Sequence, residues 1–357
     1  MARAPVTRPA SRVRRSDCST PGIRRVGHGR GFSYLDPGGG RVSDPATILR
    51  IRELAIPPAW REVWICPDPR GHLQATGIDA AGRKQYLYHE AWRRRRDGEK
   101  FRRMLEFGAA LPVLRRGVAR DLRARGLGRD RVLACAVRLL DVGLFRVGGE
   151  EYAEEGGLGL ATLRRRHVTV RNGVMRFDYP AKSGVRRVHD VVDADCERVV
   201  RALTRRPGGS RTLLAFWENG RWHSARADDI NAYLKARLGQ GFSAKDFRTW
   251  NATVLAAACL AAQDAGRPGE ATRKRAIDAA VRRVSEALGN TPAIARRAYI
   301  DPRVFDRYRS GWTIAPALPV GGTGATIGPR VRARLERAVI DLLGDAHDPS
   351  AVERLAA

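Results

Sequence analysis

The first third of the chain contains short runs of apolar and β-branched residues that are typical of β-strands. Between residues 60 and 89, strand character occurs at residues 62–66, 73–78 and 84–88. Prolines and glycines separate these runs, as they do at turns. The pattern predicts a small antiparallel β unit.

Helical spacing replaces this pattern after His89, which places a domain boundary near residue 96. Within residues 130–144, apolar residues recur every three or four positions, as on the buried face of a helix. Further helices are predicted at residues 193–205, 226–238, 244–264, 271–288 and 328–344.

One sheet is expected among these helices. Two β-branched stretches, residues 168–170 and 174–179, flank Asn172-Gly173, which is a dipeptide that strongly predicts a tight hairpin. A third strand is expected at residues 187–192, after Ser183-Gly184.

Together these elements predict an α+β fold, with a small antiparallel β N-terminal domain and a larger, mainly α-helical domain that contains a three-stranded β-sheet. The expected bounds are 28–96 for the small domain, 97–345 for the large domain and 346–357 for a C-terminal tail. Residues 1–27 are rich in Arg, Pro and Ser, so we expect a flexible basic arm there.

The net charge of the chain indicates what kind of partner it binds. The 357 residues include 66 Lys and Arg against 38 Asp and Glu, a formal net charge of +28. Such an excess favours a nucleic acid as the partner. Nearly all of the basic residues are arginines, a bias that base composition alone can produce, so the few lysines are the more informative cations.

Other site classes are not indicated. The five cysteines are scattered without zinc spacing, so we expect neither a disulfide framework nor a metal site. Asp228-Asp229 is interpreted as a helix-capping pair, and His167 and His189 as structural residues. Because no apolar run is long enough to span a bilayer, we expect a soluble, cytoplasmic protein without a membrane partner.

Four blocks, in a fixed order, carry groups suited to cutting a DNA strand. They contain Arg146 with Tyr152, then Lys182, then Lys245 with Arg248, and finally Asn290 with Tyr299. Strand cleavage needs a nucleophile, cations on the phosphate oxygens and an acid for the leaving oxygen. A single tyrosine or arginine is more often structural, so the order of the blocks carries the prediction.

These blocks resemble those of poxvirus-type and bacterial type IB DNA topoisomerases over roughly residues 30–310. The resemblance implies that Tyr299 is the nucleophile, that Arg146 and Arg248 bind the phosphate, and that Lys182 is the acid. Asn290 stands where most relatives have His. An Asn amide donates a hydrogen bond but does not titrate.

The resemblance also implies DNA contacts outside the catalytic set. Tyr86 and Tyr88 would share one face of a strand and Gln85 the other. In the family, the glutamine reads base edges while the tyrosines contact phosphates. Tyr152 and Lys245 are the further DNA-binding candidates.

The implied function is ATP- and metal-independent relaxation of supercoiled duplex DNA through a 3′-phosphotyrosyl intermediate, strand rotation and religation. A monomer without cofactors, acting as a clamp on nucleoid DNA, is expected. A site-specific tyrosine recombinase is the alternative, although that family usually has His where this chain has Lys245. A non-catalytic DNA-packaging protein would explain only the charge.

Overall fold

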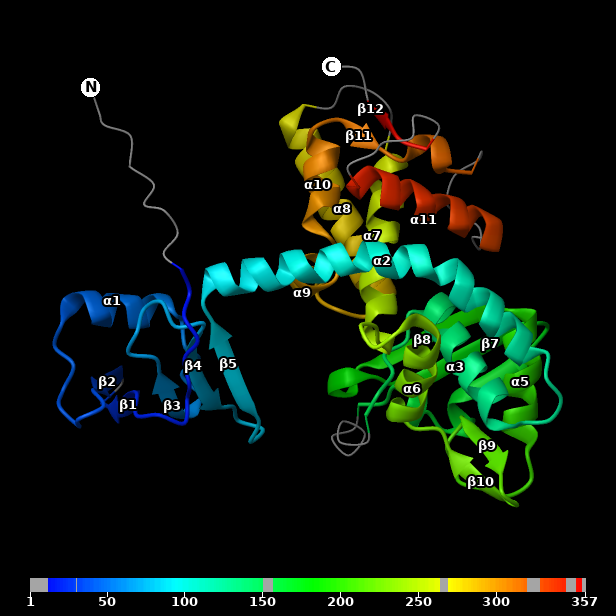
Figure 1. The fold of residues 1–357 in the computed structure, drawn as a ribbon, viewed down its shortest axis with the longest axis horizontal. Helices are drawn as coiled ribbons and strands as arrows, with labels where there is room; N and C mark the ends of the chain where they lie inside the picture. The colour runs from blue at the N-terminus through cyan, green and yellow to red at the C-terminus, as the bar shows by residue number, and fades with distance from the viewer. Residues whose placement is uncertain are drawn as a thin grey trace. The chain divides into compact units, whose positions relative to one another are not determined.

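The computed structural model describes residues 12–29, 31–149, 157–263, 269–319, 328–344 and 351–354. The chain forms two compact units, Met1–Phe101 and Arg102–Ala357 (Figure 1). Helix α2 (Glu90–Leu122) begins in the first unit and ends in the second. The division lies a few residues beyond the expected boundary near residue 96.

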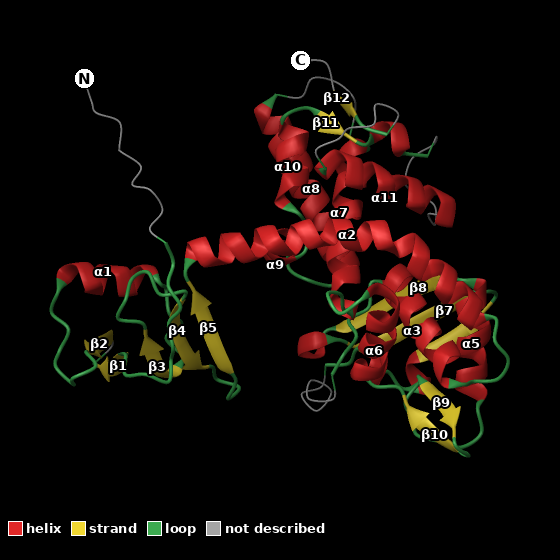
Figure 2. Ribbon diagram, in the orientation of Figure 1, coloured by secondary structure: helices red, strands yellow, loops and turns green. Residues whose placement is uncertain are grey.

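The first unit is a five-stranded antiparallel sheet with the order β2-β1-β3-β4-β5 (Figure 2). Its elements are β1 (Ile23–His28), β2 (Gly31–Leu35), α1 (Pro45–Glu53), β3 (Arg61–Ile65), β4 (Leu73–Ile78) and β5 (Lys84–Tyr88). The three strands expected from the sequence are β3, β4 and β5. Asp44 caps the N-terminus of α1, because its carboxylate accepts a hydrogen bond from the Thr47 backbone N–H at 2.8 Å.

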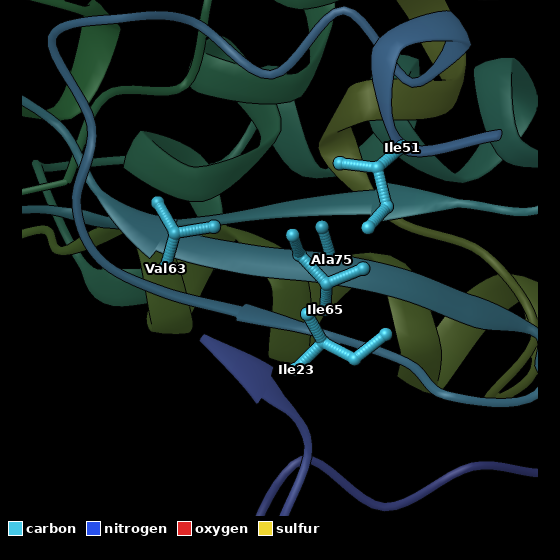
Figure 3. Close-up of a cluster of buried hydrophobic side chains, with 5 residues drawn as sticks. All are labelled: Ile23, Ile51, Val63, Ile65 and Ala75. Carbon is cyan, nitrogen blue, oxygen red and sulfur yellow. The ribbon is translucent and has the colours of Figure 1, made fainter. Parts of the chain in front are cut away.

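A single apolar cluster holds this unit together. Ile51 of α1 packs with the sheet residues Ile23, Val63, Ile65 and Ala75 (Figure 3). Each of these five side chains is at most 5% exposed. The cluster therefore joins α1 to three strands of the sheet.

The expectation of a flexible arm over residues 1–27 is wrong for residues 12–27. Strand β1 pairs with β2 and β3, and Ile23 is buried in the core. The Ser16 hydroxyl donates a hydrogen bond to the Leu73 carbonyl at 3.0 Å. Burial of Ile23 and these hydrogen bonds stabilise the segment. The rest of the expected arm, residues 1–11, lies outside the described residues.

The second unit confirms the larger, mainly α-helical domain with a three-stranded sheet. Its helices are α3 (Arg129–Gly143), α5 (Ala194–Arg205), α6 (Ala227–Leu238), α7 (Ala244–Ala261), α8 (Glu270–Leu288), α9 (Pro292–Ala298), α10 (Pro302–Arg309) and α11 (Pro329–Leu343). Helix α7 packs against α3, α6, α8, α10 and α11. Most of its side chains are buried, so it is the central helix of this unit.

The sheet has the order β6-β7-β8, formed by β6 (Val168–Arg171), β7 (Val174–Pro180) and β8 (Arg186–Val192). Asn172 and Gly173 both have positive φ, at 49° and 78°. That conformation suits the tight hairpin predicted for this dipeptide.

Several short elements complete the second unit. They are the 3₁₀ turns η1 (Leu160–Thr162), η2 (Arg165–His167), η3 (Lys182–Gly184) and η4 (Ala315–Ala317), and the strands β9 (Ala215–Glu218), β10 (Arg221–Ser224), β11 (Trp312–Thr313) and β12 (Glu353–Arg354). Strand β12 lies in the expected C-terminal tail but pairs with β11. Part of that tail is thus tied to the unit.

Candidate active site

Arg146 lies directly after α3, in a segment without regular secondary structure. Its carbonyl accepts a hydrogen bond from the Leu160 amide at 2.8 Å. Gly148 and Gly159 allow this close pairing, because a Cβ on Gly159 would lie 2.4 Å from the Gly148 Cα. These glycines therefore fix the backbone from which the Arg146 guanidinium extends.

Arg248 lies on α7 and is 3% exposed. Its guanidinium donates hydrogen bonds to the carbonyls of Leu144, at 2.5 Å, and Leu288, at 2.9 Å. One of these residues precedes the Arg146 segment and the other ends α8. Arg248 thus joins two of the blocks that the sequence separates.

Asn290 follows Gly289, which caps α8 in the left-handed conformation with φ 60°. The backbone N–H of Asn290 donates a hydrogen bond to the Ser285 carbonyl at 2.9 Å, which closes the turn. Its side-chain Oδ1 accepts a hydrogen bond from the Arg146 guanidinium. The structure therefore brings Asn290 and Arg146 together.

Tyr299 lies at the C-terminal end of α9. Its backbone is fixed by Thr253 of α7, whose hydroxyl donates to the Tyr299 carbonyl at 3.3 Å and accepts from the Asp301 amide at 3.1 Å. The Cζ atom of Arg248 lies 5.2 Å from the centroid of the Tyr299 ring. The phenol thus lies beside the buried guanidinium.

The surroundings of Tyr299 favour its ionised form. Burial raises the pKa of the phenol, but the positive charges of Arg248 and Arg146 outweigh burial and lower the pKa below its ordinary value. Burial and the neighbouring Arg146 lower the pKa of Arg248 to about 10, so Arg248 is still a cation at neutral pH. The two guanidinium groups therefore make the Tyr299 phenol easier to ionise than a free tyrosine.

Three side chains around Tyr299 keep buried donors without acceptors. The Nε atoms of Arg187 and Arg248 and the Nδ2 atom of Asn290 make no hydrogen bond in the described structure. Buried donors are normally paired, and an unpaired one costs free energy. A site with unpaired donors and several cations is suited to an anion such as a phosphodiester.

Lys182 makes no described contact with the other four candidates. It lies in η3 at the tip of the β7–β8 hairpin and is exposed. Its ammonium forms no hydrogen bond or ion pair with any described residue. The stem of the same hairpin reaches the other candidates, because Tyr179 interacts electrostatically with Arg187, Arg248 and Arg146.

The DNA-contact candidates on β5 have the expected orientations. Tyr86 and Tyr88 are exposed on one face, and their stacked rings have centroids 6.2 Å apart. Gln85 lies on the other face, where its amide donates to Asp79 at 2.8 Å. Lys245 is exposed in the first turn of α7. Tyr152 lies outside the described residues.

The residues interpreted as structural have structural contacts. His167 accepts a hydrogen bond from the Arg164 amide at 3.1 Å, and Asp229 caps α6 by accepting from the Arg226 amide at 2.9 Å. The ring of His189 packs between aromatic side chains. Across the described ranges no group of His, Cys, Asp or Glu is arranged to hold a metal ion.

Residues that the sequence did not single out also contribute to the site. Thr253 contacts the backbone at the Tyr299 carbonyl and at the Asp301 amide, and Arg187 of β8 donates to the Ala287 carbonyl at 2.7 Å. A buried threonine and one arginine among many carry no distinctive sequence signal.

Known proteins match most of this chain. Residues 89–310 match the family described as "Eukaryotic DNA topoisomerase I, catalytic core". Residues 31–79 match "Bacterial DNA topoisomerase IB, N-terminal domain". A DNA topoisomerase 1B of Acanthamoeba polyphaga mimivirus is 29% identical over 295 residues, which cover 81% of this chain and 88% of the viral protein. None of the helices built from described residues is long and apolar enough to cross a membrane.

Proposed function

The chain belongs to the type IB DNA topoisomerase family, and from this membership we propose how its own residues relax supercoiled duplex DNA. Tyr299 is the nucleophile, because its phenol lies beside Arg248 and its pKa is lowered by Arg248 and Arg146 despite burial. This placement is the observation that carries the assignment.

The reaction is a transesterification at one phosphorus atom. The Tyr299 phenol loses its proton to water as its oxygen forms a bond to phosphorus. The bond from phosphorus to the 5′ oxygen breaks, and that oxygen receives a proton. The product is a 3′-phosphotyrosyl link with a free 5′-hydroxyl end, which rotates and then attacks the link. Because the link conserves the phosphoester bond, religation needs no ATP.

Arg146, Arg248 and Asn290 stabilise the phosphorane-like transition state. The two guanidinium groups supply positive charge, and the unpaired Nδ2 of Asn290 supplies a neutral donor. The hydrogen bond from Arg146 to Asn290 Oδ1 orients that amide with its NH₂ group available. Asn290 therefore acts as a fixed donor that does not titrate.

Lys182 is the general acid in cleavage and the base in religation. Its position at the tip of the β7–β8 hairpin, exposed and without a described partner, suits a residue that reaches the leaving oxygen when DNA is bound. A neighbouring phosphate favours the ammonium form, so the proton is available at neutral pH.

Duplex DNA is the substrate. The protein binds it as a clamp, as expected in the family. It acts as a monomer on nucleoid DNA. Tyr86 and Tyr88 contact phosphates from their exposed face of β5, and Gln85 reads a base edge. Tyr152 and Lys245 add contacts near the cleavage site. The net charge of +28 predicts an affinity that falls steeply with salt.

Plasmid relaxation tests the proposed nucleophile. The wild type and Tyr299→Phe are incubated with a single supercoiled plasmid in EDTA without ATP. Tyr308→Phe is the matched control, because it removes a buried phenol from the neighbouring helix α10. We expect relaxation by the wild type and by the control, and none by Tyr299→Phe.

The other outcomes identify the competing functions. Relaxation that persists in Tyr299→Phe would place the nucleophile elsewhere. DNA binding without relaxation by the wild type would fit a packaging protein. Joining of strands between two duplex sites, without relaxation of a single plasmid, would fit a tyrosine recombinase.

A further inference from the structure

Arg187 lies on the inward face of β8, although it is charged. Its neighbours Arg186 and Val188 are exposed, and Val188 is 50% exposed. The Arg187 guanidinium is directed toward the end of α8, where Nη2 donates to the Ala287 carbonyl at 2.7 Å. The strand thus turns a cation inward and a valine outward, which hydrophobic burial alone would not favour.

Two guanidinium groups hold consecutive carbonyls at the end of α8. Arg187 binds the Ala287 carbonyl, and Arg248 binds the Leu288 carbonyl. The last carbonyls of a helix have no partner within the helix and carry partial negative charge, so cations stabilise them. Asn290 follows immediately, after the left-handed residue Gly289.

Arg187 also packs directly against this turn. A Cβ at Gly289 would lie 2.7 Å from Arg187 Nη1, so the guanidinium occupies the space that any larger residue would need. Asn290 has no other side-chain anchor in the described structure than its hydrogen bond with Arg146. The direction of its Nδ2 group therefore depends on the backbone turn that Arg187 contacts.

No described carboxylate pairs with Arg187. The contrast is Arg115, which is bound by both Asp141 and Glu336. Burial lowers the pKa of Arg187, and the nearby Arg146 lowers it further. The described hydrogen-bond partner of the Arg187 guanidinium is instead the Ala287 carbonyl at the end of α8.

From these contacts we propose that Arg187 is a positioning residue for strand cleavage, which holds the Ala287–Asn290 turn so that the Asn290 amide faces the scissile phosphate. The inference rests on the proposed function of the same site. Arg187 acts through Asn290, so its loss should matter mainly while Asn290 is present.

A double-mutant cycle tests this dependence. Single-turnover cleavage rates at saturating DNA are measured for wild type, Arg187→Gln, Asn290→Ala and the double variant. We expect Arg187→Gln to slow cleavage by roughly 10- to 100-fold, because a misplaced group loses its transition-state contact. In the Asn290→Ala background the same change should cost less than about threefold.

Two further measurements separate positioning from folding and from DNA binding. The DNA dissociation constant, measured in the Tyr299→Phe background, should change less than about threefold on Arg187→Gln. Arg176→Gln is the matched control, because this β7 arginine is exposed and paired with Asp190. If Arg187→Gln lowers Tm to near the assay temperature, the cycle is run with Arg187→Lys, which keeps the charge and one donor.

Three results would overturn the proposal. These are unchanged cleavage by Arg187→Gln, an equal loss with and without Asn290, and a loss confined to DNA affinity. Each of these results counts against the proposal only if the wild type cleaves DNA in the same assay. A wild type without cleavage activity would instead refute the proposed function itself.

Discussion

The Arg146 guanidinium donates a hydrogen bond to the Asn290 side-chain oxygen, and Asn290 Nδ2 is left buried and unpaired. The pair therefore combines a charged group with a neutral donor of fixed direction. Asn290→Ala removes that donor, and we expect cleavage to slow by roughly 100-fold. Single-turnover cleavage of a duplex oligonucleotide measures the loss.

Asn290→His should restore cleavage but make it depend on pH. A neutral imidazole offers one acceptor for Arg146 and one donor for phosphate, whereas an imidazolium has no acceptor. Arg146 and Arg248 disfavour the charged ring, so its pKa should lie below about 6.5. Cleavage by this variant should therefore fall as pH is lowered through that pKa. A profile parallel to that of the wild type would contradict this account.

The Tyr299 phenol should titrate below the ordinary value of about 10. Arg248 and Arg146 favour the phenolate more than burial disfavours it. Arg146→Met removes one charge but keeps the burial, so the pKa should rise. NMR titration of ring-labelled tyrosine measures both values, with the Tyr299→Phe spectrum identifying the resonance. An unchanged pKa in Arg146→Met would refute the electrostatic activation.

Loss of the Lys182 acid should be rescued by a better leaving group. We expect Lys182→Ala to slow cleavage of ordinary DNA by about 10²- to 10⁴-fold. A substrate with sulfur in place of the 5′ oxygen leaves without a proton, so the variant should cleave it at nearly the wild-type rate. Lys274→Ala, which removes an exposed lysine of α8, is the control for charge. If Lys182→Ala slows cleavage of both substrates equally, Lys182 is not the acid.

Asp141 connects α3 to two other helices and should be important for stability. Arg115 binds its carboxylate through two hydrogen bonds, at 2.8 and 2.9 Å, and Arg332 of α11 binds it at 2.7 Å. Asp141→Asn leaves Glu336 to pair with both Arg115 and Arg332, and this loss of one buried negative charge should cost about 3–5 kcal/mol of unfolding free energy. Asp190→Asn, which breaks an exposed pair, should cost about 1 kcal/mol or less.

The same carboxylate predicts the direction of acid sensitivity. Burial raises the pKa of Asp141, but Arg332 and Arg115 outweigh burial and lower it below its unfolded value. Its contribution to stability is therefore present above about pH 3.9 and is lost as pH falls through the lower folded pKa. Urea unfolding of the wild type and Asp141→Asn at several pH values measures this, and the stability difference should shrink in acid.

The elements with strong periodicity were predictable from the sequence, and the weakly patterned ones were not. Strand β4 and helix α3 were predictable from their apolar residues, and the structure buries five of the six β4 residues and ten of the fifteen α3 residues. Strand β1 has arginines at two of its six positions, and its place in the sheet depends on pairing with β2 and β3. Such pairing is a tertiary effect that local pattern does not contain.

The site residues that lie in the ordered sequence blocks were predictable. Those whose position depends on contacts with neighbouring elements were not. The blocks around Arg146, Arg248 and Tyr299 pointed to a common site, and the structure brings these three residues together. Arg187 was missed, because the apolar Val188 and Val192 of its strand suggest that their face is the buried one. The structure exposes both valines and turns Arg187 inward, toward the end of α8 and Arg146.

The central claim is that Tyr299 becomes covalently linked to DNA. The direct measurement is mass spectrometry of the covalent complex, trapped with a duplex whose 5′-hydroxyl end diffuses away after cleavage, then digested with protease and nuclease. We predict a 3′-nucleotide phosphate on the peptide that contains Tyr299, and no adduct in Tyr299→Phe. An adduct on another residue, or one that forms in Tyr299→Phe, would contradict the assignment.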